Sequence, residues 1–173
     1  ARFWLSHAQA LIELGSFAQA DTAIEQALAL LTGATDALER RALRARALIQ
    51  QGVIAYHRGQ TREALAQLDA ALAACREFPP LYAEALTRKA HVLFTCDRYA
   101  EARQAASQSL AIAQALTDQQ ITASALNIRG ATALMLGQTA AAIEDLRASL
   151  AAETGPASPR TAHSLNYLGT ALV

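Results

Sequence analysis

Three of the four histidines and both cysteines are the side chains of this sequence best suited to ligate a metal or attack a substrate. His57, His91 and His163 lie far apart along the chain, with no carboxylate or thiol at ligand spacing. Cys75 and Cys96 lack a histidine at a spacing typical of a nucleophilic pair. We therefore expect polar surface histidines, unreactive thiols, and neither a metal nor a cofactor.

Signatures of catalysis are also missing from the sequence. No set of serine, histidine and carboxylate suggests a catalytic triad. A phosphate-cradling loop needs clustered glycines, whereas the glycines here stand singly. The basic run of Arg40, Arg41, Arg44 and Arg46 could dock an acidic partner, but a solvated helix face is the commoner meaning of such a run. We expect a protein that is not an enzyme.

The net charge, the hydropathy and the cysteine count limit which partners and which compartment we expect. The 173 residues include 15 basic and 15 acidic side chains, so the chain lacks the net positive charge of nucleic-acid binders. No apolar run approaches the ~20 residues that span a bilayer, and no signal peptide is visible. Two cysteines are too few for a disulfide framework, which favours the reducing cytoplasm. The chain starts without Met and stops within a pattern, as expected for part of a longer protein.

The composition favours many closely packed helices. Hydrophobic residues make up 53% of the chain but aromatic residues only 5%, so alanine supplies much of the apolar content. Alanine is the best helix former and is small enough to let two helices approach closely. The first predicted helix covers residues 2–14, and a second follows after a glycine turn. Together they carry apolar or small residues at fixed offsets: Trp4, Ala8, Leu11, Gly15, Phe17, Ala20 and Ala27.

The same offsets recur along the chain, with turns at Gly15, Gly59, Asp97 and Gly137, which are 44, 38 and 40 residues apart. These residue types tolerate the left-handed backbone that ends a helix. Residues between the pairs indicate where helices end and begin. Breaks or helix ends are expected at Thr32–Thr35, Phe78-Pro79-Pro80 and Gly155-Pro156. Helix starts are expected at the capping boxes Asp36/Glu39 and Thr117/Gln120 and at Ser158-Pro159.

This pattern resembles the tetratricopeptide repeat, since all four complete pairs carry alanine at the twentieth position: Ala20, Ala64, Ala102 and Ala142. The resemblance implies an all-α, right-handed α-solenoid of antiparallel helix pairs, with four pairs plus one extra helix. We expect one solenoid domain over 1–173, with repeats at 1–34, 36–78, 81–116 and 119–153 and the start of a fifth at 158–173. The period exceeds the usual 34 or so residues. Stretched repeats of this kind are similar to those of maltose-regulator-type activators and signal-transducing ATPases of bacteria.

In that family, ligands contact fixed positions on the first helix of each pair, which lines a concave face. Carried over to this sequence, the resemblance implies a binding surface that includes Gln9, Ile12, Arg46, Ile49, Val53, Tyr56, His57, Glu84, Arg88, His91, Phe94, Asn127, Met135 and Asn166. Ile49, Val53, Tyr56 and Phe94 would form an apolar groove with a polar rim. Alternatively, these apolar residues pack against the adjacent helix pair.

The function expected from this resemblance is recognition. We expect a scaffold or sensor module of a larger bacterial signalling or transcription-regulatory protein, which binds a protein, a peptide or a small effector on its concave face. Direct binding to nucleic acid or membrane is not expected. One alternative is a structural spacer that self-associates, because Leu165, Leu168 and Leu172 of the last helix lack a covering helix. Another is a regulatory arm attached to an enzyme, whose chemistry lies outside these residues.

Overall fold

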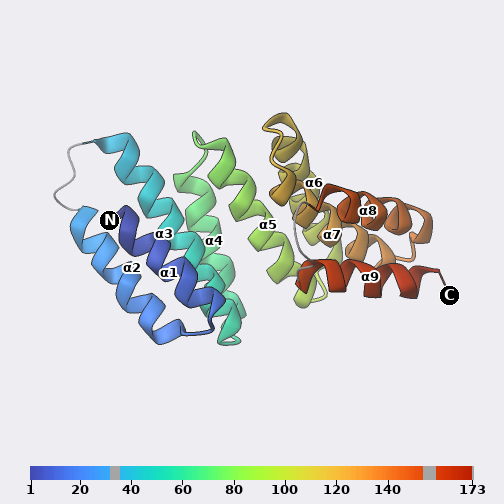
Figure 1. Ribbon diagram of the computed structural model, residues 1–173, viewed down its shortest axis with the longest axis horizontal. Helices are drawn as coiled ribbons and strands as arrows, with labels where there is room; N and C mark the ends of the chain where they lie inside the picture. The colour runs from blue at the N-terminus through green and yellow to red at the C-terminus, as the bar shows by residue number, and fades with distance from the viewer. Residues whose placement is uncertain (32–35, 154–158, 173) are drawn as a thin grey trace. The chain divides into compact units, whose positions relative to one another are not determined.

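Helices dominate the computed structural model, which describes residues 1–31, 36–153 and 159–172 (Figure 1). Within these ranges there are nine helices and no strand: α1 (Arg2–Glu13), α2 (Phe17–Leu31), α3 (Ala37–His57), α4 (Thr61–Ala74), α5 (Pro79–Thr95), α6 (Tyr99–Ala115), α7 (Gln119–Met135), α8 (Thr139–Ala152) and α9 (Pro159–Ala171). The all-α prediction of four pairs and one further helix is confirmed. The predicted break at 32–35, the punctuation at 155–156 and the capping residue at 158 lie outside the described residues.

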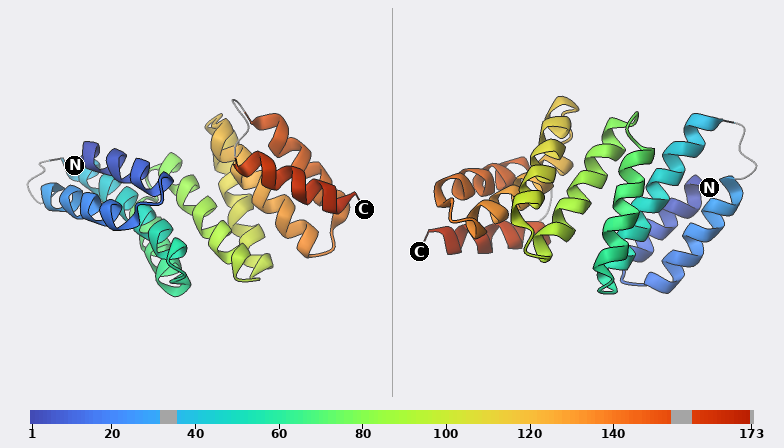
Figure 2. Two further views of the ribbon diagram at one scale, coloured as in Figure 1. Left: turned by 60° about the horizontal axis from the view of Figure 1, so that its bottom comes forward. Right: turned by 180° about the vertical axis from the view of Figure 1, so that it is seen from behind.

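The helices belong to two compact units, which are described separately: Ala1–Ala85 and Leu86–Val173. In the first unit, α1 packs against α2 and α3, and α3 also packs against α4. In the second unit, α7 packs against α6, α8 and α9. Within each pair the two helices run antiparallel through a short turn, which the views of Figure 2 show from two further sides. The unit boundary falls inside α5.

The turn within each pair has the left-handed backbone that the sequence predicted. Gly15, Gly59 and Gly137 have φ angles of 73°, 75° and 73°, and Asp97, which replaces glycine in the third pair, has φ 59°. At each turn a backbone N–H reaches back to a carbonyl of the preceding helix, as in the 3.0 Å bond from Gly15 N to Ile12 O. These bonds satisfy carbonyls that the end of a helix leaves without partners.

The capping prediction at Thr117 is wrong by one residue. Thr117 instead has φ 55°, the left-handed conformation that follows the end of α6. Asp118 is the N-cap of α7, and its carboxylate accepts a 3.0 Å hydrogen bond from the N–H of Ile121. At α3 the predicted N-cap is confirmed, because the Asp36 carboxylate accepts from the N–H groups of Leu38 and Glu39.

The two prolines after the second pair begin a helix and do not end one. The sequence predicted that Phe78-Pro79-Pro80 stops the preceding helix and that the third repeat begins at residue 81. Instead α4 already ends at Ala74, and α5 begins at Pro79. The first turn of a helix tolerates proline because the N–H groups of that turn have no partner within the helix.

Small residues bring the two helices of each pair close together. In the second pair, a Cβ atom added to Gly52 would lie 2.9 Å from Leu68 Cγ and 3.2 Å from the carbonyl oxygen of Ala64. The fourth pair repeats this arrangement at the same sequence spacing, with a Cβ on Gly130 lying 2.8 Å from Leu146 Cγ. The alanines at the twentieth position in all four pairs are fully buried: Ala20, Ala64, Ala102 and Ala142. This contact keeps each first helix in a fixed place relative to the second.

Candidate binding surface

Several predicted binding residues of the first unit are buried between its helices. Ile12 is 8% exposed and belongs to the core cluster formed by α1, α2 and α3. Ile49 is 1% exposed, and Val53 packs against the same core cluster. Neighbouring Gln50 donates a 2.8 Å hydrogen bond from Nε2 to the carbonyl oxygen of Leu5, which ties α3 to α1. Ile49 is therefore packed, as in the alternative to an open groove, and Ile12 is likewise buried.

The other predicted residues of the first unit lie nearer the surface. Arg46 is exposed, and Glu84 in the first half of α5 is half-buried. Gln9 is half-buried and donates a 2.9 Å hydrogen bond to the carboxylate of Glu13.

Aromatic rings hold the end of α3 against the start of α2. His57 is exposed on one side but stacks on Phe17 with ring centroids 5.0 Å apart. Tyr56, half-buried, meets His57 edge to face at 5.3 Å. Both predicted residues are thus in contact with neighbouring rings, so a ligand at this end of α3 would meet an aromatic surface.

In the second unit, α5 carries an exposed polar stripe beside an aromatic cluster. Arg88, His91 and Thr95 are all exposed, and their spacing places them on one side of the helix. We call these three residues the α5 stripe. Phe94, next to the stripe, contacts Tyr99 of α6 at 5.7 Å and Tyr167 of α9 at 6.0 Å between ring centroids. The rings of Phe94, Tyr99 and Tyr167, which we call the aromatic cluster, are all half-buried.

In the aromatic cluster, only Tyr99 was absent from the positions that the resemblance places on the ligand-binding face; Phe94 and Tyr167 both occupy such positions. Tyr99 occupies the seventeenth position of its repeat, where an aromatic residue also starts α2, so the repeat pattern alone assigns it to packing. Tyr167 directly follows the predicted residue Asn166, which is exposed. Its proximity to Phe94 brings α9 next to α5, and no local sequence signal indicates this contact.

The charge of Asp97 influences the edge of the aromatic cluster. The Tyr99 hydroxyl donates a 2.5 Å hydrogen bond to Oδ1 of Asp97. This bond and the nearby negative charge raise the pKa of Tyr99, because both disfavour a phenolate. Close by, Arg98 and Glu101 form a two-point ion pair, and Arg98 lowers the pKa of that carboxyl. The surface around the rings therefore offers both donors and acceptors.

Two further predicted residues lie on α7. Asn127 is only 9% exposed, and its Nδ2 donates a 2.6 Å hydrogen bond to Oγ of Ser164 on α9. This residue joins two helices and presents little surface to a ligand. Met135, at the end of α7, is 43% exposed and remains accessible.

Polar contacts fix α9 in place against α7 and α8. Ser164 is fully buried, where it contacts Asn127 and lies 3.4 Å from the hydroxyl of Ser149. Near the start of α9, Arg160 donates to Glu153 at 2.8 Å and to Ser124 at 2.6 Å. Because α9 carries Tyr167, these bonds also set the position of the aromatic cluster.

A partly buried ion pair joins the two helices of the fourth pair. Arg129 donates from Nε and from the second guanidinium nitrogen to the two carboxylate oxygens of Asp145, at 2.7 and 2.5 Å. Asp145 is 7% exposed, and the bonds to its carboxylate raise the pKa of Arg129. The pair connects α7 to α8.

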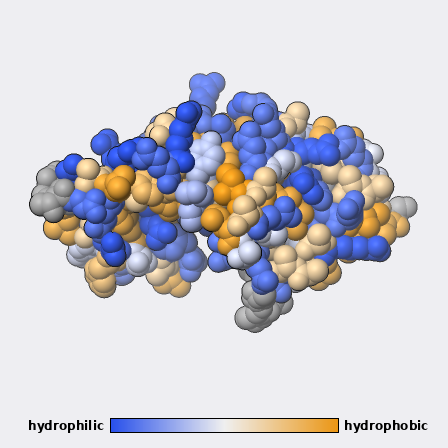
Figure 3. Space-filling model, turned by 90° about the horizontal axis from the view of Figure 1, so that it is seen from above, coloured by the Kyte–Doolittle hydropathy of each residue, from blue (hydrophilic) through white to orange (hydrophobic). Residues whose placement is uncertain are grey.

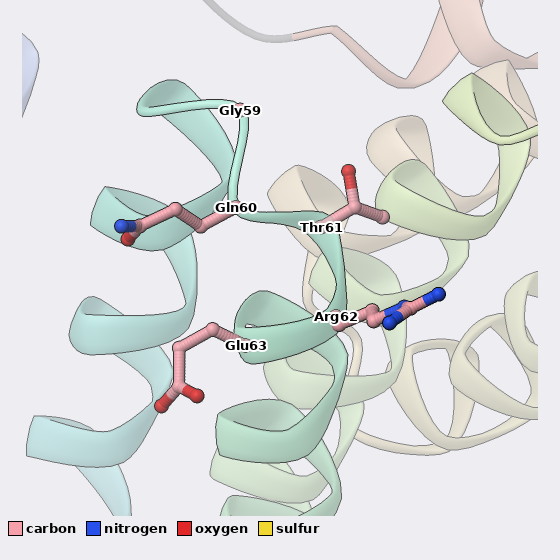
Figure 4. A pocket seen from close by; sticks show the side chains of 5 residues that line it. All are labelled: Gly59, Gln60, Thr61, Arg62 and Glu63. Carbon is pink, nitrogen blue, oxygen red and sulfur yellow. The ribbon is translucent and has the colours of Figure 1, made fainter.

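Other features of the described residues do not form a ligand site. An open hollow at the turn between α3 and α4 is lined by residues 59–63, but the side chains shown in Figure 4 diverge from one another and do not converge on a ligand position. On the face shown in Figure 3, hydrophobic residues lie in small groups separated by hydrophilic ones. Within the ranges that the structure describes, no group of three or more His, Cys, Asp or Glu is placed to hold a metal ion. None of the described helices is both long and apolar enough to cross a bilayer.

Comparison with known families agrees with the repeated helix pairs. Two family models, both described as the tetratricopeptide repeat, match residues 1–30 and 81–153. The chain belongs to the tetratricopeptide-repeat superfamily. Tetratricopeptide repeats generally mediate interactions between proteins. No protein with a curated description matches the sequence.

Solved structures share the tetratricopeptide-like fold at low sequence identity. The apo form of RapI matches with a TM-score of 0.77 and 17% identity, over 98% of this chain and 62% of RapI. A chain of the APC/C hetero-tetramer Cut9–Hcn1 matches with a TM-score of 0.72 and 19% identity, over 98% of this chain and 29% of that one. BtubC (BKLC) from P. vanneervenii matches with a TM-score of 0.76 and 17% identity, over 95% of this chain and 68% of BtubC. At these identities the likeness shows the fold alone, and this chain spans under two thirds of the first two proteins.

Proposed function

We propose that this chain is a protein-binding module that recognises a partner protein or peptide through first helices of its pairs, without catalysis of its own. The observation that carries the proposal is the match of both units to tetratricopeptide repeats, whose general role is to hold other proteins. A structural neighbour supports it, because the matching chain was solved as part of a hetero-tetramer, Cut9–Hcn1. The role that we assign is a scaffold or sensor segment of a larger bacterial signalling or transcription-regulatory protein in the cytoplasm.

The α5 stripe and the aromatic cluster are the surface that we assign to the partner. Arg88 supplies a permanent cation, and His91 three residues later supplies a donor or acceptor. The half-buried rings beside them provide apolar area that a side chain of the partner can cover. This arrangement suits a peptide that carries a carboxylate next to an apolar side chain, since the charge orients it and the apolar contact adds affinity.

A capture experiment with charge-reversal variants tests this assignment. The bait is the 173-residue chain, and the variants are Arg88→Glu on the α5 stripe and Arg147→Glu on α8. Both arginines are exposed on helices, so the two variants make the same chemical change with the same small effect on folding. A specific partner should bind Arg88→Glu at least about tenfold more weakly than the parent and bind Arg147→Glu normally. Equal loss in both variants, or no loss in either, would refute the assignment of this surface.

A structural spacer that self-associates is the second candidate, and one observation favours it. Leu165 of α9 and Leu172, which directly follows α9, are 56% and 58% exposed, and exposed leucines can mark a surface where another protein binds. If the bait captures only further copies of itself, and Arg88→Glu leaves that capture unchanged, the spacer function replaces recognition of a partner.

A further inference from the structure

The third pair carries an aspartate at the turn where the other three complete pairs carry glycine. Asp97 has φ 59°, in the left-handed region that glycine adopts at no steric cost. The first, second and fourth pairs have Gly15, Gly59 and Gly137 at this position. The backbone of the turn therefore does not require a carboxylate. A residue other than glycine in this region is a reason to ask what its side chain does.

The carboxylate of Asp97 lies at one edge of the aromatic cluster. Asp97 is exposed, and its Oδ1 accepts the 2.5 Å hydrogen bond from the hydroxyl of Tyr99. This bond is the main cause of the raised pKa of Tyr99, and the nearby phenol of Tyr167 raises it further. The two phenol groups thus lie close to each other and to the carboxylate. Because the rings are half-buried, part of their surface is open to a ligand.

This edge of the cluster is negatively charged. Asp97 forms no ion pair with any residue in the described part of the chain. The neighbouring cation, Arg98, makes its two-point ion pair with Glu101, which balances its charge there. A carboxylate accepts up to about four hydrogen bonds, and the Tyr99 hydroxyl accounts for one of them. The charge and the remaining acceptor positions of Asp97 are therefore available to a cationic donor.

We propose that Asp97, Tyr99 and Tyr167, which we call the cation corner, bind the side chain of an arginine of the partner protein. A guanidinium group donates two parallel N–H bonds to a carboxylate. Its flat face stacks on an aromatic ring, whose negative face attracts the charge. Arginine suits the corner better than lysine, because an ammonium group has no flat face to stack. The proposal rests on the proposed function, since the partner covers the same rings, and adds a cation to the chemistry of that partner.

Titration with small probes tests the cation corner without the partner. The probes are N-acetyl-arginine methylamide and its neutral isostere, N-acetyl-citrulline methylamide. Each is titrated into the ¹⁵N-labelled 173-residue chain at low salt and followed by NMR. The arginine probe should shift the amide signals of residues 97–99 saturably. The citrulline probe should bind at least about fivefold more weakly, because it lacks the charge that the carboxylate and the rings attract.

Variants that remove one carboxylate locate the binding. Asp97→Asn keeps a residue type that tolerates the left-handed backbone, and Asp97→Gly introduces the residue of the other turns, so both should fold. Both should weaken binding of the arginine probe by at least about fivefold. Asp118→Asn is the matched control and should bind as the parent does. It removes one carboxylate from the same unit and keeps the N-cap of α7, because asparagine caps a helix as well as aspartate does.

Four results would overturn the proposal. Three concern the site: no saturable shift at residues 97–99, equal binding of the two probes, and equal loss of binding in Asp97→Asn and Asp118→Asn, which would mean attraction by net charge alone. The fourth is tighter binding of N-acetyl-lysine methylamide than of the arginine probe, which would overturn the choice of arginine. None of these measurements involves Arg88 or a captured partner, so they can fail while the capture experiment with Arg88→Glu supports the proposed function, and the reverse.

Discussion

Replacing Gly130 by alanine measures how tightly the helices of the fourth pair cross. The new Cβ would lie 2.8 Å from Leu146 Cγ and 3.2 Å from the carbonyl oxygen of Ala142, so the paired helix must move. Overpacking of this kind costs about 1–3 kcal/mol. Alanine also favours a helix over glycine by about 1 kcal/mol, which offsets part of the cost. We therefore expect the free energy of unfolding to change by between about 0 and −2 kcal/mol.

Gly169→Ala is the matched control, because it makes the same substitution within a helix where no described atom obstructs the new Cβ. Only the helix preference acts there, so the free energy of unfolding should rise by up to about 1 kcal/mol. The difference between the two variants isolates the overpacking cost, about 1–3 kcal/mol. In melting temperature this corresponds to about 2–4 °C for each kcal/mol in a chain of this size.

Urea unfolding followed by far-UV circular dichroism gives the free energies of both variants. Because a single helix can open before the rest of a repeat protein, amide hydrogen exchange of α7 and α9 verifies which helices each substitution affects. If Gly130→Ala stabilises the chain as much as Gly169→Ala, α7 and α8 do not cross as closely as we describe.

Three further predictions follow from the fold. Asp36→Ala should destabilise α3 by about 1 kcal/mol, seen as faster hydrogen exchange in its first turn, because two N–H groups lose their carboxylate acceptor. Arg129→Met should lower the free energy of unfolding, measured in urea titrations, by roughly 2–4 kcal/mol, because it leaves the buried carboxylate of Asp145 unpaired. An unchanged free energy would refute a structural role for the pair. At pH 8, a disulfide reagent should modify Cys96 first and Cys75 only on unfolding, because burial raises the pKa of Cys75 to about 11 and keeps its thiol protonated. Equal rates of modification at the two cysteines would contradict this.

Local rules in the sequence were enough to predict the helix pairs and their turns. Glycine at positions 15, 59 and 137 permits a left-handed backbone at no steric cost, and Asp97 tolerates it. The turn at Thr117 was missed because a β-branched residue rarely adopts this conformation, so its type carries no signal. The start of α5 at Pro79 was missed because proline both ends helices and begins them.

The binding surface was harder to predict, because the repeat pattern assigns a residue to a side of its own helix but does not say what covers it. Ile12 and Asn127 occupy positions that bind ligands in this family, yet neighbouring helices bury both. The contact between Phe94 and Tyr167 likewise depends on where α9 lies, and the polar contacts of Ser164 and Arg160 that help to place α9 are not indicated by the apolar pattern. Arg88 and His91 are exposed as the resemblance implied, and their role in binding stays a prediction.

Site-specific photo-crosslinking tests most directly whether a partner lies on the first helices. A photoreactive amino acid is placed at residue 91 on the α5 stripe in one variant and at exposed residue 147 on α8 in the other, and each is irradiated with the captured partner. Our account predicts a crosslinked complex from residue 91 and none from residue 147. Crosslinking from residue 147 alone would place the partner on the second helices and contradict the account.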